Sequence, residues 1–561
     1  LNAFYIYILF KKYGQTIQTV LKLYCMEKSI VDEKIYKEER SKNKKDKYKF
    51  SRKRVVLITV AGLLIVIAIL GGAFGCYALG VNFAKTVITL KVDDTFQVME
   101  GFGASSAWVY QSLGIYDNEE LKEETVEMLY GDSGLGLNTF RYNIGAGGAE
   151  LDLYKDKLRG AESFFIADRF NGDYSVFSDV NNYDFTRDKG VIDLFEKALA
   201  LGNIKEVVFF ANSPHYLMTQ NGKTHSDEKK QNNLKPECYD AYCQYLLVIV
   251  DYLYTNVVSK YDPSITVRIS PVNEPQWDWG GEDASQEGCH FDPKDLAKFY
   301  DVFNKKLTDY NESKSLNFAM DIFESGNYKM RDVKAKVQTY IQEFAKYDWF
   351  DELDGISVHS YGVNLEDLAR VRFHNYVKNI YDGLDVRVSE YCVMQGGVDS
   401  GIDMGIYSAK VILRDLGIVN AVSWNYWLSV STYDYEDGLV YWDGADGISV
   451  TKRYYAMGQF SRYITQGSVR IRADYNDSFG FNGVDCVAFK RPDGSIVLVV
   501  INDSNRDKDI KIKGGYENIQ EIVTTQDKNW VTAEYVYDGY ITAPAKSIVT
   551  YIMTQPISEE D

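Results

Sequence analysis

Between residues 101 and 426, short apolar runs alternate with longer amphipathic stretches, and this alternation constrains the fold more than any other feature. The strand-like runs cover residues 101–105, 137–144, 206–212, 265–273, 317–323, 355–360, 386–390 and 421–426. Stretches between them have the apolar spacing of helices, at 190–201, 239–260, 293–310 and 408–416. Eight β-then-α units in succession predict an α/β fold, a (β/α)8 TIM barrel, over residues 101–454.

A second pattern begins at residue 455. Short strand-like segments follow one another with turn residues between them, at 484–490, 495–502, 510–513, 519–524 and 548–551. Arg491-Pro-Asp-Gly494 has the composition of a hairpin turn. Residues 455–555 are therefore expected to form a β-sandwich side domain. The strand-like segment at 85–100, ahead of the barrel, is expected to join it.

The first 80 residues differ from the rest in charge and hydropathy. Residues 1–54 carry fifteen Lys/Arg against six Asp/Glu and are followed by an uncharged apolar run over 55–80. This run is long enough to span a bilayer, and the positive-inside rule leaves residues 1–54 as a basic cytoplasmic tail. We expect an N-terminal transmembrane anchor with the catalytic body outside the cell. A cleaved signal peptide is the alternative. The first Met is Met26, so a second alternative is that residues 1–25 are not translated.

Composition narrows the partners and cofactors. The chain carries a net charge of −18, of which the basic first 54 residues contribute +9, so the remainder carries −27. A body this acidic argues against nucleic-acid binding. Five His and the absence of HExxH or CxxC motifs give no sign of a metal site or other cofactor. The five Cys after residue 80 are odd in number, so no disulfide framework is indicated.

Two of the strand-like runs end in glutamates that suggest chemistry. Ile265-Thr-Val-Arg-Ile-Ser-Pro-Val-Asn-Glu-Pro places Glu274 at the end of the fourth run, and Val386-Arg-Val-Ser-Glu places Glu390 at the end of the seventh. In a barrel of parallel strands, the carboxyl ends of all strands meet at one face, which carries the active site. Two carboxylates brought together there are the minimum apparatus of a glycosidase.

The segments around both glutamates resemble glycoside hydrolase family 30, a barrel family of clan A. Further similar motifs lie in the same order: Glu100-Gly-Phe-Gly-Ala-Ser-Ser-Ala-Trp108, Asn138-Thr-Phe-Arg-Tyr-Asn143, Ala211-Asn-Ser-Pro214, His359-Ser-Tyr361, Ser423-Trp-Asn-Tyr-Trp427 and the segment 455–470. The resemblance implies a retaining mechanism with Glu390 as nucleophile and Glu274 as acid/base. It also implies a set of substrate-binding residues: Trp108, Arg141, Asn143, Asn212, Asn273, Trp277, His359, Tyr361, Trp424 and Trp427.

The implied roles carry electrostatic expectations. Arg141 should lower the pKa of Glu390, with Tyr361 hydrogen-bonded to the same carboxylate. The anionic partner and the apolar wall of Trp277 should raise the pKa of Glu274. Each residue also has a structural alternative, because a buried ion pair or core packing would account for the same residue types.

The substrate is expected to be a polysaccharide or oligosaccharide. The segments Pro275-Gln-Trp-Asp-Trp279 and Ser285-Gln-Glu-Gly-Cys289 look most like the endo-β-1,6-galactanase subfamily, whereas His215-Tyr-Leu departs from it. The alternatives are another family 30 specificity, such as xylanase, β-1,6-glucanase or exo-β-glycosidase, and a catalytically inert glycan-binding protein.

Overall fold

The eight strand-like runs form the wall of a parallel barrel. The structure, a computed structural model, describes residues 86–381, 383–475, 483–514, 516–535 and 539–554. The barrel strands are β2 (Gly101–Ser105), β3 (Thr139–Ile144), β4 (Glu206–Ala211), β5 (Thr266–Ser270), β6 (Ala319–Met320) with β7 (Phe323–Ser325), β8 (Gly355–His359), β9 (Asp385–Glu390) and β10 (Ala421–Ser431). Almost every residue in them is buried, which is typical of parallel strands covered on both faces.

The barrel closes at its fifth position, where the strand is split. The strand order is β6-β5-β4-β3-β2-β10-β9-β8-β7, and the two end strands are separated in sequence only by Asp321 and Ile322. The sheet therefore returns to its start. Outside this ring, β11 (Gly438–Trp442) pairs with β10, and β12 (Ile448–Val450) pairs with β11.

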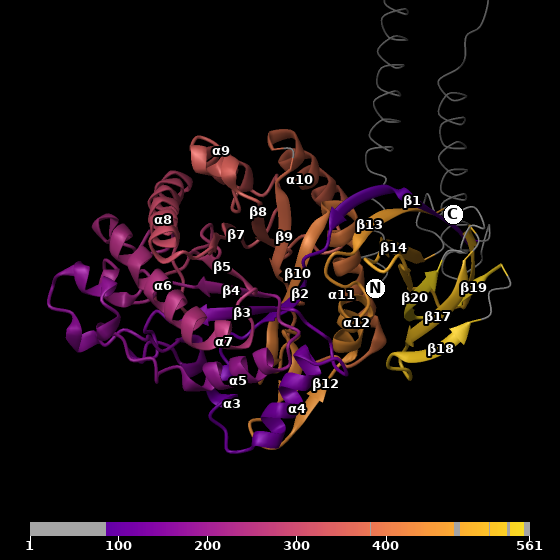
Figure 1. Cartoon of the computed structure of the whole chain (residues 1–561), viewed down its shortest axis with the longest axis horizontal. Helices are drawn as coiled ribbons and strands as arrows, with labels where there is room; N and C mark the ends of the chain where they lie inside the picture. The colour runs from indigo at the N-terminus through magenta and orange to yellow at the C-terminus, as the bar shows by residue number, and fades with distance from the viewer. Residues whose placement is uncertain (1–85, 382, 476–482, 515, 536–538, 555–561) are drawn as a thin grey trace, which may run out of the picture. The chain divides into compact units, whose positions relative to one another are not determined.

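Helices surround the strands (Figure 1). They are α3 (Tyr110–Leu113), α4 (Glu119–Tyr130), α5 (Lys189–Ala200), α6 (Tyr239–Leu253), α7 (Ser259–Tyr261), α8 (Pro293–Lys314), α9 (Val337–Phe344), α10 (Asp367–Ile380), α11 (Ile402–Arg414) and α12 (Lys452–Ser461). The helix expected over 239–260 is α6 and α7, joined by a π-helical turn at Tyr254–Val258, and α11 ends in a second one at Asp415–Val419.

The second pattern forms a nine-stranded sheet. It contains β1 (Thr86–Val98), β13 (Val469–Tyr475), β14 (Val484–Lys490), β15 (Ile496–Asn502), β16 (Lys508–Lys513), β17 (Glu517–Thr524), β18 (Val531–Tyr535), β19 (Ile541–Ala543) and β20 (Ser547–Thr554). The strand expected ahead of the barrel is β1, which pairs antiparallel with β13 and parallel with β16. In the strand order β18-β17-β20-β15-β14-β13-β1-β16-β19, strands β20 and β19 are far apart. The hydroxyl of Tyr551 on β20 nevertheless donates to the carbonyl of Thr542 on β19 at 2.9 Å, so the two halves of the sheet face each other.

Strand β15 shows how the sandwich is attached to the barrel. Its side chains alternate between two cores: Val497, Val499 and Ile501 belong to the barrel core, and the residues between them belong to the sandwich core. Helices α11 and α12 contact both the sandwich and each other, and they lie between the barrel strands and the sandwich (Figure 1). The side domain is therefore part of the barrel's packing.

The N-terminal expectations fall outside the described residues. The anchor at 55–80 and the basic tail lie in the part of the chain that is not described. Among the described residues, no helix combines the length and apolarity needed to cross a membrane. Five cysteines of the described part are free and buried: Cys238, Cys243, Cys289, Cys392 and Cys486.

The shared core predicts that damage to the sandwich destabilises the barrel. Ile501→Ala should lower the free energy of unfolding by about 2–5 kcal/mol, because a fully buried side chain facing the barrel leaves a cavity. The exposed Val531→Ala on β18 is the control and should change it by less than about 0.5 kcal/mol. Denaturant titration followed by enzymatic activity and by circular dichroism measures both. A barrel that keeps its unfolding midpoint in Ile501→Ala contradicts this coupling.

Candidate active site

A cleft of about 770 Å³ opens at the carboxyl ends of the barrel strands, and both glutamates line it. Its other walls are rich in aromatic rings: Trp108, Trp277, Trp279, Tyr361, Trp427, Tyr433 and Tyr435. Aromatic faces suit the C–H faces of sugar rings, and few polar groups are needed to orient a ligand in such a site. The cleft is thus a carbohydrate-type site built around two carboxylates.

Glu390 ends β9 and is held at both oxygens. Arg141 of β3 donates from Nη1 to Oε2 at 2.7 Å, and the Tyr361 hydroxyl donates to Oε1 at 3.0 Å. These contacts fix the direction of the carboxylate. Burial raises the pKa of Glu390 and outweighs His359 and Arg141, which lower it. Arg141 lowers the pKa of Glu390 as expected, but complete desolvation of the carboxylate is the larger effect, so the net shift is upward.

Glu274 lies four residues beyond β5 in a strained backbone. Its φ is +46°, a left-handed conformation that costs free energy for a residue with a Cβ. Two hydrogen bonds hold the backbone of Glu274. The Glu274 N–H donates to the carbonyl of Glu324 at 2.9 Å, and the Glu274 carbonyl accepts from the indole N–H of Trp279 at 2.8 Å. Gly326 packs so closely that a Cβ there would come within 2.5 Å of Glu274 Oε1. The position of the carboxyl group is thus imposed by its neighbours.

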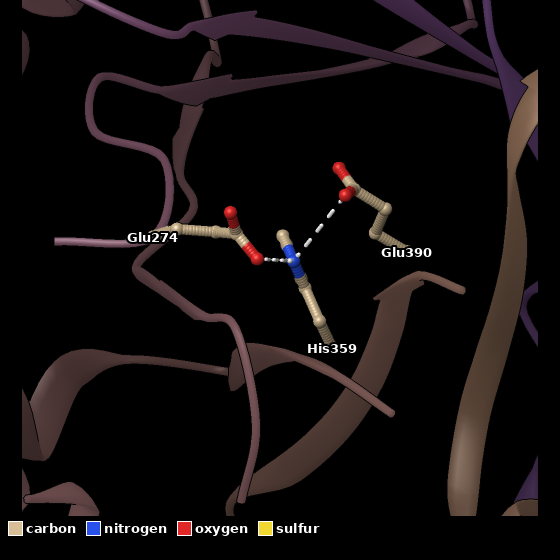
Figure 2. Close-up of side chains that lie close together, drawn as sticks. All are labelled: Glu274, His359 and Glu390. Atoms are coloured by element: carbon tan, nitrogen blue, oxygen red, sulfur yellow. Dashed lines mark hydrogen bonds and ion pairs between the residues drawn. The ribbon is translucent and has the colours of Figure 1, made fainter. Parts of the chain in front are cut away.

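His359 bridges the acidic groups (Figure 2). Its Nδ1 lies 3.1 Å from Glu274 Oε1 and 3.5 Å from Glu390 Oε1. Its Nε2 lies 2.7 Å from Oε2 of Glu324, a fully buried residue of β7. Burial lowers the pKa of His359, but the three carboxylates together raise it to about 10. The imidazole is therefore a cation at neutral pH.

Glu324 is the permanent anion of this group. Burial raises its pKa, but Arg141 and His359, with a hydrogen bond from Ser389, lower it to about 2. Arg141 Nη2 lies 3.4 Å from Glu324 Oε1, and the Ser270 hydroxyl donates to the same oxygen at 3.1 Å. Glu324 thus contacts both cations that touch Glu390 and Glu274.

A chain of amides fixes the residue before Glu274. Arg141 Nη2 donates to Asn273 Oδ1 at 3.1 Å, Asn273 Nδ2 donates to Asn212 Oδ1 at 3.1 Å, and Asn212 Nδ2 donates to Asn143 Oδ1 at 2.9 Å. Because each carbonyl accepts from the preceding donor, the orientation of the Asn273 amide is fixed: one of the two N–H donors of Nδ2 binds Asn212, and the second N–H remains. Asn273 lines the cleft beside both glutamates.

The separation of the two glutamates and the state of His359 decide the chemistry. One carboxylate oxygen of Glu274, one of Glu390 and one His359 nitrogen lie within 4.8 Å of one another, a geometry that could also hold a metal ion. Both imidazole nitrogens already face carboxylates, and the raised pKa of His359 favours the protonated ring, which is a poor metal ligand. The oxygen separation fits the roughly 5–5.5 Å between carboxyl groups that a double displacement needs.

The sequence-predicted residues fall into three groups. Trp108, Asn273, Trp277, Tyr361 and Trp427 line the cleft with the two glutamates. The second group does not line the cleft but is hydrogen-bonded, directly or through one another, to Glu274, Glu390 and Asn273. Its members are Arg141, Asn143, Asn212 and His359. Trp424 is a correction: it is fully buried, and its indole N–H donates to Asp415 Oδ2 at 3.0 Å below the cleft. Trp424 therefore has no face to offer a sugar and supports the strand instead.

Several site residues escaped the sequence reasoning. Glu324 follows directly on the run expected to end at residue 323, so the strand-end rule that found Glu274 and Glu390 could have found it. Arg159, Tyr433 and Asp437 line the cleft from long connections without periodic signal. Burial raises the pKa of Asp437 to about 6, and the Ser431 hydroxyl donates to it at 2.7 Å.

The comparison with known families identifies the class. The sequence model of the O-glycosyl hydrolase family 30 matches residues 85–441, and that of the glycosyl hydrolase family 30 β-sandwich domain matches residues 467–551. The matches cover the barrel and the sandwich found above. The chain belongs to glycoside hydrolase family 30 and is a glycosidase.

Individual relatives are distant. An endo-β-1,6-galactanase of Hypocrea rufa is 23% identical over 68% of this chain and 76% of that protein. An exo-β-1,6-galactobiohydrolase of Bifidobacterium longum is 23% identical over 43% of this chain, which spans only 19% of that longer protein. Among solved structures, an exported protein of Bacteroides fragilis has a TM-score of 0.71 at 23% identity, covering 83% of this chain and 100% of that one. The family 30 xylanase C of Talaromyces cellulolyticus has a TM-score of 0.65 at 19% identity, covering 84% and 100%.

The buried ion pair makes stability depend on pH. The pKa of His359 rises from its ordinary 6.5 to about 10 on folding, so its contribution is complete below about pH 6.5 and is lost as pH rises through about 10. Glu324→Gln removes one of the anions that hold the proton, so the folded-state pKa of His359 should fall and its contribution should be exhausted at a lower pH. The wild type should lose stability throughout the interval from pH 7 to pH 9, which lies between the unfolded and folded pKa values of His359. The variant should be less stable than the wild type at pH 7 and should show a smaller drop between pH 7 and pH 9 in denaturant unfolding.

The control for this experiment is Glu352→Gln, because Glu352 is exposed on the turn Asp348–Glu352. It should reproduce the wild-type drop between the two pH values. An equal drop in Glu324→Gln and Glu352→Gln would show that Glu324 does not hold the proton on His359.

Proposed function

We propose that the chain is a retaining glycoside hydrolase in which Glu390 is the nucleophile and Glu274 the acid/base. The observation that carries this is the pair of carboxylates whose oxygens lie within 4.8 Å, above a shared His359. The nucleophile must attack as a carboxylate, and Arg141 and Tyr361 aim both its oxygens. Among the residues that the structure describes, His359 is the one side chain that hydrogen-bonds the Glu274 carboxyl group, at Oε1. The other oxygen can face the leaving group.

In the first step, Glu390 forms a bond to the anomeric carbon while Glu274 gives its proton to the departing glycosidic oxygen. In the second step, Glu274, now a carboxylate, takes a proton from water, which displaces Glu390. The second N–H of the Asn273 amide can hydrogen-bond the sugar 2-OH, an interaction that strengthens in the transition state. His359 faces both glutamates and stabilises whichever one is anionic.

Variants separate the two roles. Glu390→Gln should abolish turnover on every substrate, because no covalent intermediate can form. Glu274→Gln should still react with an aryl glycoside that has a good leaving group, accumulate the glycosyl-enzyme, and be partly rescued by azide. NMR of the first-formed product should show retained configuration. An inverted product, or azide rescue of the residue 390 variant to an α-azide, would mean that the roles are assigned wrongly.

For the substrate, we propose β-1,6-linked galactan side chains. Two relatives with a named activity, an endo-β-1,6-galactanase and an exo-β-1,6-galactobiohydrolase, act on this type of linkage, and the segment 275–289 resembles the galactanase subfamily. A neutral substrate also suits the cleft, whose Arg159 is already accompanied by Asp156 at 3.4 Å. The endo mode of cleavage expected from the sequence is a separate matter from linkage.

A panel of three purified polymers tests the substrate. The enzyme should release reducing sugar from β-1,6-galactan at least about tenfold faster than from xylan or β-1,6-glucan, a preference of about 1.4 kcal/mol. The Glu390→Gln variant gives the background for each polymer. Faster hydrolysis of xylan or β-1,6-glucan would replace the galactan proposal, and hydrolysis of none of them together with glycan binding would favour the inert binding protein.

We also propose that the catalytic body lies outside the cell, carried by the N-terminal apolar segment. The basic residues 1–54 before the uncharged run at 55–80 support this orientation. Protease added to intact cells should remove the catalytic body, whereas an antibody tag placed before residue 54 should be protected. A body protected from protease until the cells are broken would overturn this orientation.

A further inference from the structure

One arginine joins the loops at one end of the cleft. Arg159, on the connection between β3 and α5, places its guanidinium carbon 3.7 Å from the centre of the Trp108 ring and 5.0 Å from that of Tyr433. Its Nη1 donates to Gln286 Oε1 at 3.1 Å. The contacted residues follow β2, β10 and β5, so a single side chain ties together four connections above the barrel.

The chemistry decides which end of the cleft this is. Glu390 bonds to the anomeric carbon, so the glycone, the sugar on the non-reducing side of the cleaved bond, extends away from Glu274. Around the barrel, β10 and β2 follow β9, the strand of Glu390. Trp427 and Trp108, which belong to or follow these strands, therefore bound the glycone side. The leaving group lies on the side of Glu274 and of Trp277, which follows β5.

Trp108 does not offer an open aromatic face on the glycone side. Trp108 is only 4% exposed, its ring meets Trp427 edge to face at 5.0 Å, and Arg159 covers one face of the indole. A sugar cannot stack on a face that a guanidinium occupies. The φ of Trp108 is +67°, a conformation that the surrounding contacts must maintain. A chain of sugars running past Trp427 would thus meet Arg159, Trp108 and Tyr433.

Carboxylates surround Arg159 at this end of the cleft. Asp156 lies 3.4 Å from its Nε, and the carboxylates of Asp434 and Asp437 line the same cleft. An anionic sugar would have to displace or face these carboxylates. The guanidinium carbon lies over the Trp108 ring and near the Tyr433 ring, and a planar, delocalised guanidinium packs on an aromatic face in a way that a lysine could not reproduce.

We infer that Arg159 is a specificity-determining residue that limits how many sugars fit on the glycone side. The enzyme then cuts at a fixed short distance from the non-reducing end and releases a short product of uniform size. This inference rests on the proposed retaining mechanism, which defines the glycone side, and on no particular linkage. It departs from the endo mode that the sequence favours, because an internal cut needs a cleft open at both ends.

The size of the earliest products tests the inference. The wild-type enzyme is incubated with whichever polymer of the panel it hydrolyses, and the oligosaccharides are separated by chromatography over time. One short oligosaccharide is expected from the first time point. Arg159→Ala should shift the products to a ladder of many lengths, with a faster fall in the viscosity of the polymer per bond cleaved.

Matched variants separate this role from a general loss of structure. Arg169→Ala removes an exposed arginine from the same connection and should leave product sizes unchanged. Gln286→Ala removes the hydrogen-bond partner and should shift the products in the same direction as Arg159→Ala. A ladder of products from the wild-type enzyme at the first time point overturns the inference. So does an unchanged product pattern in Arg159→Ala.

The outcome is distinct from that of the substrate proposal. If β-1,6-galactan is left intact while another polymer is hydrolysed, the galactan proposal fails, and the product sizes from that other polymer still decide the role of Arg159.

Discussion

The charge balance of one buried group governs the rest of the site. Three carboxyl groups, of Glu274, Glu324 and Glu390, share two cations, Arg141 and His359, all at 8% exposure or less. Isolated charges in such surroundings are costly, so the group favours neutrality. Both cations lie against Glu324 and hold its pKa well below its ordinary value. The same two cations also contact the glutamates of the cleft: Arg141 lies against Glu390, and His359 faces both Glu390 and Glu274.

The same group accounts for strain in the backbone. Phe323, Glu324 and Glu274 have φ values of +82°, +45° and +46°, and they are adjacent through the hydrogen bond from Glu274 N–H to the Glu324 carbonyl. Each such conformation disfavours folding and persists only where the surroundings determine it. Phe323 and Glu324 begin β7, directly after the interruption of the fifth strand at Asp321 and Ile322, and the Glu324 side chain faces His359. The irregular fifth strand thus carries a third glutamate, Glu324, in the site.

The sequence predicted the fold and the position of the site where a periodic apolar pattern could be combined with a general rule about where barrel strands end. The eight runs located every barrel strand, and the rule that parallel strands present their carboxyl ends together brought Glu274 and Glu390 into one site. It failed where contacts depend on loops or on competition between energies. Arg159 stacks on Trp108 across two connections that carry no periodic signal. The pKa of Glu390 depends on whether burial or the nearby cations dominate, which no sequence pattern encodes. Trp424 lies three residues before Trp427 on the same strand, yet its indole N–H donates to Asp415 instead of facing the cleft.

Asp415 connects the active site to the side domain. It lies in the π-helical turn Asp415–Val419 and is fully buried, where it accepts hydrogen bonds from Trp424, from the Ser360 hydroxyl at 2.6 Å and from Arg370 at 2.8 Å. Ser360 directly follows His359. On the other side of the turn, Gln97 of β1 donates to the Leu416 carbonyl at 2.7 Å and to that of Ala421 at 3.2 Å. A π-helical turn leaves backbone carbonyls out of the ordinary helical pattern, and a side chain from the sandwich satisfies them. The sandwich strand β1 thereby holds the turn that positions Asp415, and Asp415 holds the end of the strand that carries His359. This chain of contacts gives a physical reason for the barrel and the sandwich to fold together.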